Sequence, residues 1–138
     1  MYSFAQRRDT RVVDEPLYAH YLRVSGAAHP GREEILAAMP TDGCRVMLRL
    51  ASEECEAEVL FAKQMAHHFV DLDTGVLEPF EHFLLLRDPI EMLPSLLEIL
   101  DEVTLRDTGL PDQVRLVDGL ESVGRAPFCI ESKALLLD

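Results

Sequence analysis

Short apolar runs alternate with longer segments of helical periodicity along the chain, and this alternation constrains the fold more than any other feature. The pattern is typical of βαβ units, in which parallel strands form a sheet and helices cover its faces. Four runs have the character of strands, and they cover residues 11–14, 58–63, 82–87 and 126–131. The sequence therefore predicts an α/β fold, a three-layer sandwich with a mainly parallel sheet.

Five segments between these runs have the apolar spacing of helices: residues 17–24, 32–39, 44–51, 90–100 and 112–123. The last of them keeps apolar residues at three-residue steps, at Val114, Val117, Leu120 and Val123, which predicts one buried stripe. Gly124 follows directly, as a glycine commonly does at the end of a helix. The runs at 58–63 and 82–87 are almost continuously apolar, so we expect them to be the central strands.

Charge and cysteine content exclude several classes of protein. The 138 residues allow one domain at most, with a net charge of −12 that argues against nucleic-acid or anionic membrane partners. The three cysteines, Cys44, Cys55 and Cys129, lack zinc-type spacing, so we expect a reducing compartment and no metal. No apolar run is long enough for a signal peptide or a membrane span, which makes the cytoplasm the expected location.

The strongest local signal is the segment L-R-D-P at residues 86–89, which ends the most apolar run. In parallel sheets, ligands bind beyond the carboxyl ends of the strands, near helix N-termini. The Arg87 guanidinium could hold a phosphate through two hydrogen bonds, and the Ser95 hydroxyl could add a third. Composition alone favours a plainer interpretation, in which Asp88 caps the helix, Pro89 takes its first position and Arg87 pairs with a neighbouring acid.

A second signal follows the run at 58–63. Lys63 stands at the end of the strand, where its charge could neutralise a transferring group. His67 or His68 could act as a general base on an acceptor hydroxyl, although a solvent-facing histidine beside a packed one is an equally good interpretation. No third ligand stands at a spacing that would make this pair a metal site.

A third signal is the acidic pair Asp14-Glu15, where the first strand ends. Glu15 could be a base or could orient a substrate. On chemistry alone we favour the interpretation that both acids complement the N-terminal dipole of the following helix.

Four segments in order resemble a bacterial sulfotransferase-like family of the P-loop NTPase fold: M-Y-S-F-A-Q-R, D-E-P-L-Y-A-H-Y-L, F-A-K-Q-M-A-H-H and H-F-L-L-L-R-D-P-I-E-M-L-P-S. They are also similar to the sulfotransferase-like domain fused to plant branched-chain aminotransferase-like proteins. This resemblance spans nearly the whole chain. It implies an enzyme that needs no metal and transfers a sulfuryl group from the adenosine-phosphate donor PAPS to an acceptor hydroxyl or amine.

The resemblance also implies roles for individual residues. The pattern R-D-P-x-x-x-x-x-S matches the element that grips the 3′-phosphate of PAPS or its product PAP, so it assigns Arg87 and Ser95 to the donor and reverses the composition-only preference. The segment that leaves the strand at Lys63 resembles the place where many sulfotransferases hold a catalytic lysine and histidine. Here the nearest histidine is His67, and the implied catalytic set is Lys63, His67 and Glu15.

Family members usually carry a strand and a loop of the type P-R-x-x-S-T-A-L before the segment that matches residues 1–4. We therefore expect residues 1–138 to form a single partial domain, truncated at both ends and lacking the first strand and the phosphate-binding loop, which would leave unpaired edges between inner strands. One alternative is a non-catalytic nucleotide-binding or interaction module, which could form homo-oligomers through exposed sheet edges. A phosphotransferase of the same fold is less favoured, because the sequence has no loop lysine.

Overall fold

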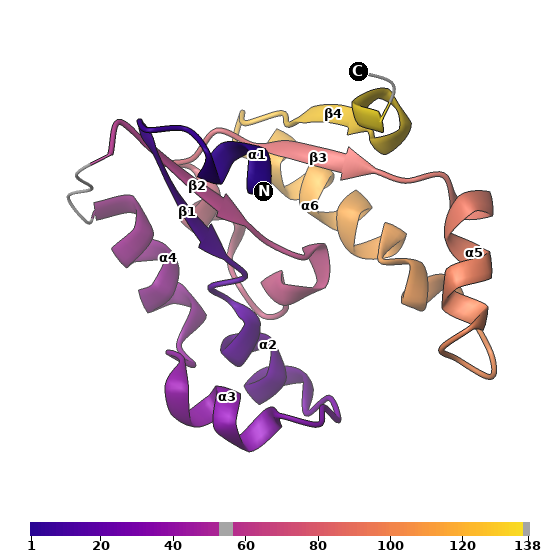
Figure 1. The fold of residues 1–138 in the computed structure, drawn as a ribbon. Coiled ribbons are helices and arrows are strands. Elements are labelled where there is room, and N and C mark those ends of the chain that lie inside the picture. Colours follow the sequence, from indigo (N-terminus) through magenta and orange to yellow (C-terminus); the bar gives the residue numbers. More distant parts are fainter. Residues whose placement is uncertain (53–56, 137–138) are drawn as a thin grey trace. The chain divides into compact units, whose positions relative to one another are not determined.

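A computed structural model describes residues 1–52 and 57–136, so Cys55 lies outside the described part. The chain divides into two compact units, Met1–Val76 and Leu77–Asp138, each with its own pair of strands (Figure 1). Along the first unit run α1 (Tyr2–Ala5), β1 (Thr10–Asp14), α2 (Tyr18–Ser25), α3 (Arg32–Ala38), α4 (Gly43–Ser52), β2 (Val59–Lys63) and the 3-10 helix η1 (Ala66–Phe69).

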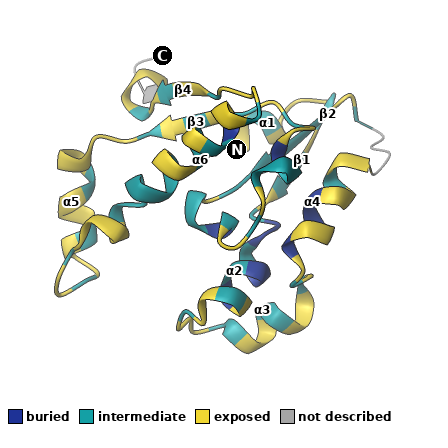
Figure 2. Cartoon of the chain, turned by 180° about the vertical axis from the view of Figure 1, so that it is seen from behind, coloured by how far each residue is buried: buried dark blue, intermediate teal, exposed yellow. Residues whose placement is uncertain are grey.

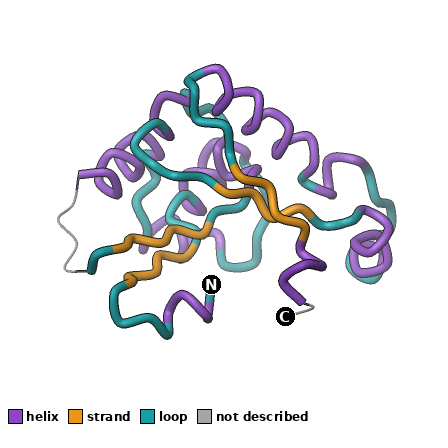
Figure 3. The backbone as a smooth tube through the Cα atoms, turned by 90° about the horizontal axis from the view of Figure 1, so that it is seen from above, coloured by secondary structure: helices purple, strands orange, loops and turns teal. Residues whose placement is uncertain are grey.

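In the unit Met1–Val76, β1 and β2 lie side by side and run parallel (Figure 3). The register pairs Thr10 with Val59 at one end and Asp14 with Lys63 at the other. Both strands therefore reach their carboxyl ends together, which is the edge where parallel sheets bind ligands. The ring of Phe4 in α1 stacks on Phe61 of β2, with centroids 4.1 Å apart.

The core of this unit gathers on α2 and α4, where Figure 2 shows most of its dark blue residues. Its buried apolar side chains are Leu17, Ala19 and Leu22 around α2 together with Val46 and Met47 on α4. Gly43 begins α4 directly against the His20 ring, and a Cβ there would lie 2.8 Å from ring atoms. The close approach of these two helices therefore depends on a glycine at this position.

The 3-10 helix η2 (Thr74–Leu77) spans the boundary between the units. The unit Leu77–Asp138 then contains β3 (Phe83–Leu86), α5 (Pro89–Leu97), η3 (Leu105–Thr108), α6 (Leu110–Ser122), β4 (Phe128–Glu131) and η4 (Ser132–Leu136). Strands β3 and β4 are parallel, in a register that pairs Phe83 with Phe128. The side-chain amide of Gln113 ties α6 to this pair by donating to the Leu85 carbonyl at 3.1 Å.

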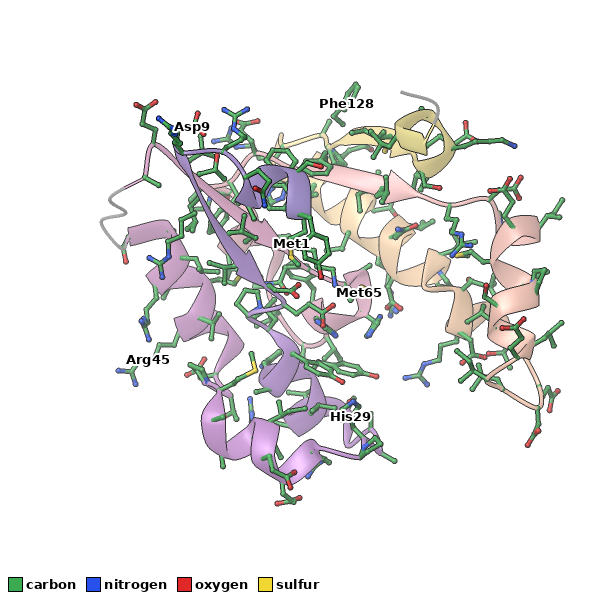
Figure 4. The ribbon with its side chains drawn as sticks, viewed as in Figure 1. Met1, Asp9, His29, Arg45, Met65 and Phe128 are labelled. Carbon is green, nitrogen blue, oxygen red and sulfur yellow. The ribbon has the colours of Figure 1, made fainter. Side chains whose placement is uncertain are left out.

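Burial in this second unit is sparse. Leu120 of α6 is 2% exposed, whereas Phe128, which projects away from β4 in Figure 4, is 70% exposed. The expected stripe on α6 is confirmed at Leu120 and is absent at Val114, which is 58% exposed near the start of the helix. The helix ends as predicted, because Gly124 takes φ 73° and Arg125 donates to the Leu120 carbonyl at 2.8 Å.

The α/β class, the parallel pairing and all four expected strands are confirmed, and each of the five expected helices is present within about three residues of its predicted bounds. Within the described residues, β2 pairs with β1 alone and β3 with β4 alone. Each of the two expected central strands thus keeps one edge that no described strand occupies, so neither of them is central within the described residues. Of the described helices, none is long and apolar enough to cross a membrane.

Candidate functional site

The carboxyl ends of β1 and β2 bring three charged side chains together. The Lys63 ammonium forms an ion pair with the Glu15 carboxylate, and its Nζ lies 3.7 Å from Oδ1 of Asp14. The side chains of Lys63 and Glu15 are 36% and 26% exposed, so both are partly withdrawn from water. One ammonium between two carboxylates gives this edge of the strand pair a local net charge of about −1.

This arrangement differs from the interpretation that composition favours. The first turn of α2 contains no acidic residue, so Asp14 and Glu15 do not complement its dipole. The reason is that three residues, Glu15, Pro16 and Leu17, lie between the end of β1 at Asp14 and the start of the helix at Tyr18. The acids instead lie at the strand end and face the lysine of the neighbouring strand.

His68 on η1 is a packed histidine, only 1% exposed. Its ring stacks on those of Tyr18 and Tyr21, with centroid distances of 5.1 Å in both cases. Burial lowers the pKa of His68 to about 4, and the positive charges of His67 and Lys63 act in the same direction. The imidazole is therefore neutral at pH 7, and its Nδ1 has no hydrogen-bond partner within the described part of the chain.

His67 has a different environment. Its ring is half-buried and meets the rings of Tyr21 and His68 edge-on, at centroid distances of 4.8 and 4.6 Å. The predicted interpretation of a solvent-facing histidine beside a packed one is therefore met at His68, which is packed, whereas His67 is half-buried and not fully exposed to solvent. Of the two rings, that of His67 is the less buried.

Two residues, Gln64 and Met65, separate β2 from η1, and neither side chain is titratable; Met65 is labelled in Figure 4.

The segment after η1 is fixed by His20, which sequence reasoning missed. Nε2 of His20 lies 2.8 Å from the Val70 carbonyl, and the Gly43 N–H donates to Nδ1 at 3.2 Å. The ring is 3% exposed, so this histidine links α2, the start of α4 and the chain after η1. A histidine in the middle of the expected helix at 17–24 was the available signal.

In the unit Leu77–Asp138, the R-D-P segment starts α5 as its local chemistry predicts. The Asp88 carboxylate accepts from the N–H of Ile90 at 2.9 Å, and Pro89 takes the first helical position. Arg87 is exposed, and its Nη2 donates to the main-chain carbonyl of Glu91 at 3.4 Å. Ser95 lies on α5 and is also exposed. Helix capping is confirmed, while the Arg87 guanidinium and the Ser95 hydroxyl remain accessible to a ligand.

A family model described as a sulfotransferase domain matches residues 1–125. The chain belongs to this sulfotransferase family. Two proteins of Arabidopsis thaliana, branched-chain-amino-acid aminotransferase-like proteins 2 and 1, are 32% and 33% identical to it. Each match covers all of this chain and 25% of the relative, so the chain spans a quarter of their length. No solved structure matches it significantly.

In this sulfotransferase domain the expected site residues fall in two groups. Glu15, Lys63 and His67 belong to the unit Met1–Val76, where the first two are in direct contact. Arg87 and Ser95 belong to the unit Leu77–Asp138. Across the described ranges, no three His, Cys, Asp or Glu side chains gather in a way that could hold a metal ion.

Proposed function

We propose that this chain is the sulfotransferase part of an enzyme that moves a sulfuryl group from PAPS to an acceptor hydroxyl or amine. The observation that carries this proposal is the placement of Lys63 at the carboxyl end of the β1–β2 pair, in a chain of the sulfotransferase family. Ligands of parallel sheets bind at that edge, and a transferring sulfuryl group needs a cation there.

Lys63 is suited to meet the transferring group even though it is already paired. An ammonium has three N–H donors. Glu15 accepts one of them, and the others can reach sulfuryl oxygens. We assign to Lys63 the stabilisation of negative charge that develops as the sulfur–oxygen bond to the donor phosphate breaks.

We assign proton transfer to His67. In the proposed step the acceptor oxygen or nitrogen forms a bond to sulfur, the bond from sulfur to the phosphate oxygen breaks, and PAP leaves with the electron pair. The proton of the acceptor passes to the imidazole of His67. His67 is favoured over His68 because His68 is almost fully buried between two tyrosine rings.

We assign the donor nucleotide to the R-D-P segment. The exposed Arg87 guanidinium offers two parallel N–H groups to a phosphate, and Ser95 offers a hydroxyl on the same helix that Asp88 caps. The net charge of −12 makes such a placed cation necessary, because the chain as a whole repels a nucleotide anion.

The test is a calorimetric titration of the chain with adenosine 3′,5′-bisphosphate. We expect Arg87→Ala to weaken binding about 10- to 100-fold, since a charge-assisted hydrogen bond contributes about 1.5–3 kcal/mol. Arg106→Ala, which removes an exposed arginine of η3 in the same unit, is the matched control and should bind like the wild type. Equal binding by the Arg87 and Arg106 variants, or no binding by a folded wild-type chain, would overturn the donor assignment.

A second candidate is a non-catalytic module that pairs with another copy of the chain or with another protein. It is favoured by the edges of β2 and β3, which no described strand occupies. Light scattering at several protein concentrations, together with an assay of sulfuryl transfer, separates the enzyme from the non-catalytic module. A stable dimer that binds adenosine 3′,5′-bisphosphate but transfers no sulfuryl group would support the module.

A further inference from the structure

Glu15 has a backbone conformation that side chains with a Cβ seldom adopt. Its φ is 44°, in the left-handed region, where a non-glycine residue is strained. Asp71, with φ 54°, is the other such residue in the described ranges. Glycine would take this conformation at Glu15 without strain, and yet the chain carries a long acidic side chain there.

The left-handed backbone changes where the side chain points. Successive residues of an extended strand face opposite sides, so Asp14 and Glu15 would diverge if β1 continued. The Glu15 N–H still donates to the Lys63 carbonyl at 2.8 Å, as in a parallel ladder, but the Glu15 carbonyl turns away and accepts from the Tyr18 N–H at 2.9 Å. The chain turns from strand to helix at this residue, and both carboxylates come within 4 Å of the Lys63 ammonium.

We propose that Glu15 is a positioning residue, and that its left-handed backbone exists to place the carboxylate that holds the Lys63 ammonium at the strand end. The inference rests on the proposed function, in which Lys63 meets the transferring group. Lysine has a flexible four-carbon stem, so an ammonium without a partner would sample many positions. The Glu15 carboxylate fixes that position before any substrate arrives, and leaves donors of the ammonium available to the sulfuryl oxygens.

The chain allows a direct test, because Lys63 and Lys133 are its only lysines. Limited acetylation with acetic anhydride, followed by mass spectrometry, reports the accessibility of Lys63 relative to Lys133 in the full chain. Lys133 is ion-paired with Glu91 in the other unit, and it serves as the internal reference. The variants are Glu15→Gln, which keeps the side-chain length, Glu15→Gly, which also relieves the backbone, and Asp71→Gly, which relieves only the second left-handed residue.

We expect the Lys63-to-Lys133 labelling ratio to rise about two- to fivefold in both Glu15 variants, the range for losing a partly exposed ion pair. Asp71→Gly should leave the ratio unchanged. Glu15→Gly should melt at least as high as Glu15→Gln, because glycine relieves the strain that glutamine retains. An unchanged ratio in both Glu15 variants would show that Glu15 does not hold Lys63. A melting temperature of Glu15→Gly well below that of Glu15→Gln would show that the backbone is not strained, and either result overturns the proposal.

This labelling needs neither donor nor acceptor, so it stands apart from the proposed function. Loss of adenosine 3′,5′-bisphosphate binding only in Arg87→Ala tests the donor assignment, whereas the labelling ratio tests Glu15. The Glu15 variants could show a raised Lys63-to-Lys133 labelling ratio while the wild type binds no nucleotide. That outcome would contradict the donor assignment and still support the proposal that Glu15 positions Lys63.

Discussion

In the unit Met1–Val76 the proposed site residues are held by neighbouring side chains, whereas in the unit Leu77–Asp138 they extend into solvent. Lys63 is ion-paired with Glu15, and His67 packs against two other rings. Arg87 and Ser95 are exposed, and the one described hydrogen bond of the Arg87 side chain is long, at 3.4 Å. The comparison indicates that the proposed transfer side is preorganised, whereas the proposed donor side must be organised by its ligand.

The largest expected difference concerns the cores of the two units. Leu22 on α2 is 1% exposed, while Leu97 on α5 is 61% exposed. We expect Leu22→Ala to reduce the free energy of unfolding by about 2–5 kcal/mol, because it leaves a cavity. Leu97→Ala should change it by less than about 0.5 kcal/mol, as for other surface substitutions. Urea denaturation measures both, and equal losses would mean that the exposed face of α5 is covered in solution.

His68 makes the first unit sensitive to acid. Its folded-state pKa of about 4 is below the ordinary value of 6.5, mainly because of burial and secondarily because of His67 and Lys63. The unfolded chain therefore binds the proton more readily than the folded chain does. The contribution of His68 to the free energy of unfolding is complete above about pH 6.5 and is lost as the pH falls toward 4. The loss should be about 3 kcal/mol, at 1.36 kcal/mol for each unit of pKa.

Carboxylates also titrate near the lower end of this range, so the comparison with a variant is decisive. His68→Phe keeps a ring between the two tyrosines and should flatten the decline in stability between pH 6.5 and 4.5. His29→Gln, at an exposed histidine, should leave the decline unchanged. Parallel pH profiles for His68→Phe and the wild type would contradict the buried, neutral state of His68.

A substitution at Gly43 tests how closely α4 approaches the His20 ring. An added Cβ would meet the His20 ring at 2.8 Å, so Gly43→Ala must displace the ring or the helix. We expect a loss of about 1–3 kcal/mol, the usual range for overpacking. Gly31→Ala is the matched control, since its nearest neighbour would be 3.8 Å away. If the two variants melt at the same temperature, the result would argue against close packing of His20 on Gly43.

Local chemistry was sufficient to predict most of the secondary structure. Apolar runs identified all four strands, and the glycine after residue 123 marked the end of α6, because both signals act within a few residues. The Asp88 cap and Pro89 at the first helical position were equally local. Periodicity also identified Leu120 as buried, although it could not show that Val114 on the same stripe would remain exposed.

The side-chain partners at the candidate site were not predictable in the same way. The contact between Glu15 and Lys63 joins residues 48 positions apart, and it requires a left-handed residue that propensity argues against. The role of His20 depends on carbonyl and N–H groups of two distant segments, at Val70 and Gly43. The Glu15–Lys63 contact follows from the register of β1 with β2, and the His20 contacts follow from the packing of α2 against α4 and the chain after η1. No residue pattern specified either arrangement.

The smallest expected effect lies in the second unit, at the start of α5. Asp88 accepts from the Ile90 N–H at 2.9 Å, so Asp88→Ala leaves a helix N–H to be satisfied by water. We expect a loss of about 1 kcal/mol in the free energy of unfolding, and almost none for Asp88→Asn, because asparagine caps equally well. If both variants behave like the wild type, Pro89 alone determines where α5 begins. If Asp88→Ala loses stability and also binds adenosine 3′,5′-bisphosphate more weakly, this cap partly preorganises the proposed donor side. The two units would then differ less in how far their proposed site residues are held in place before a ligand binds.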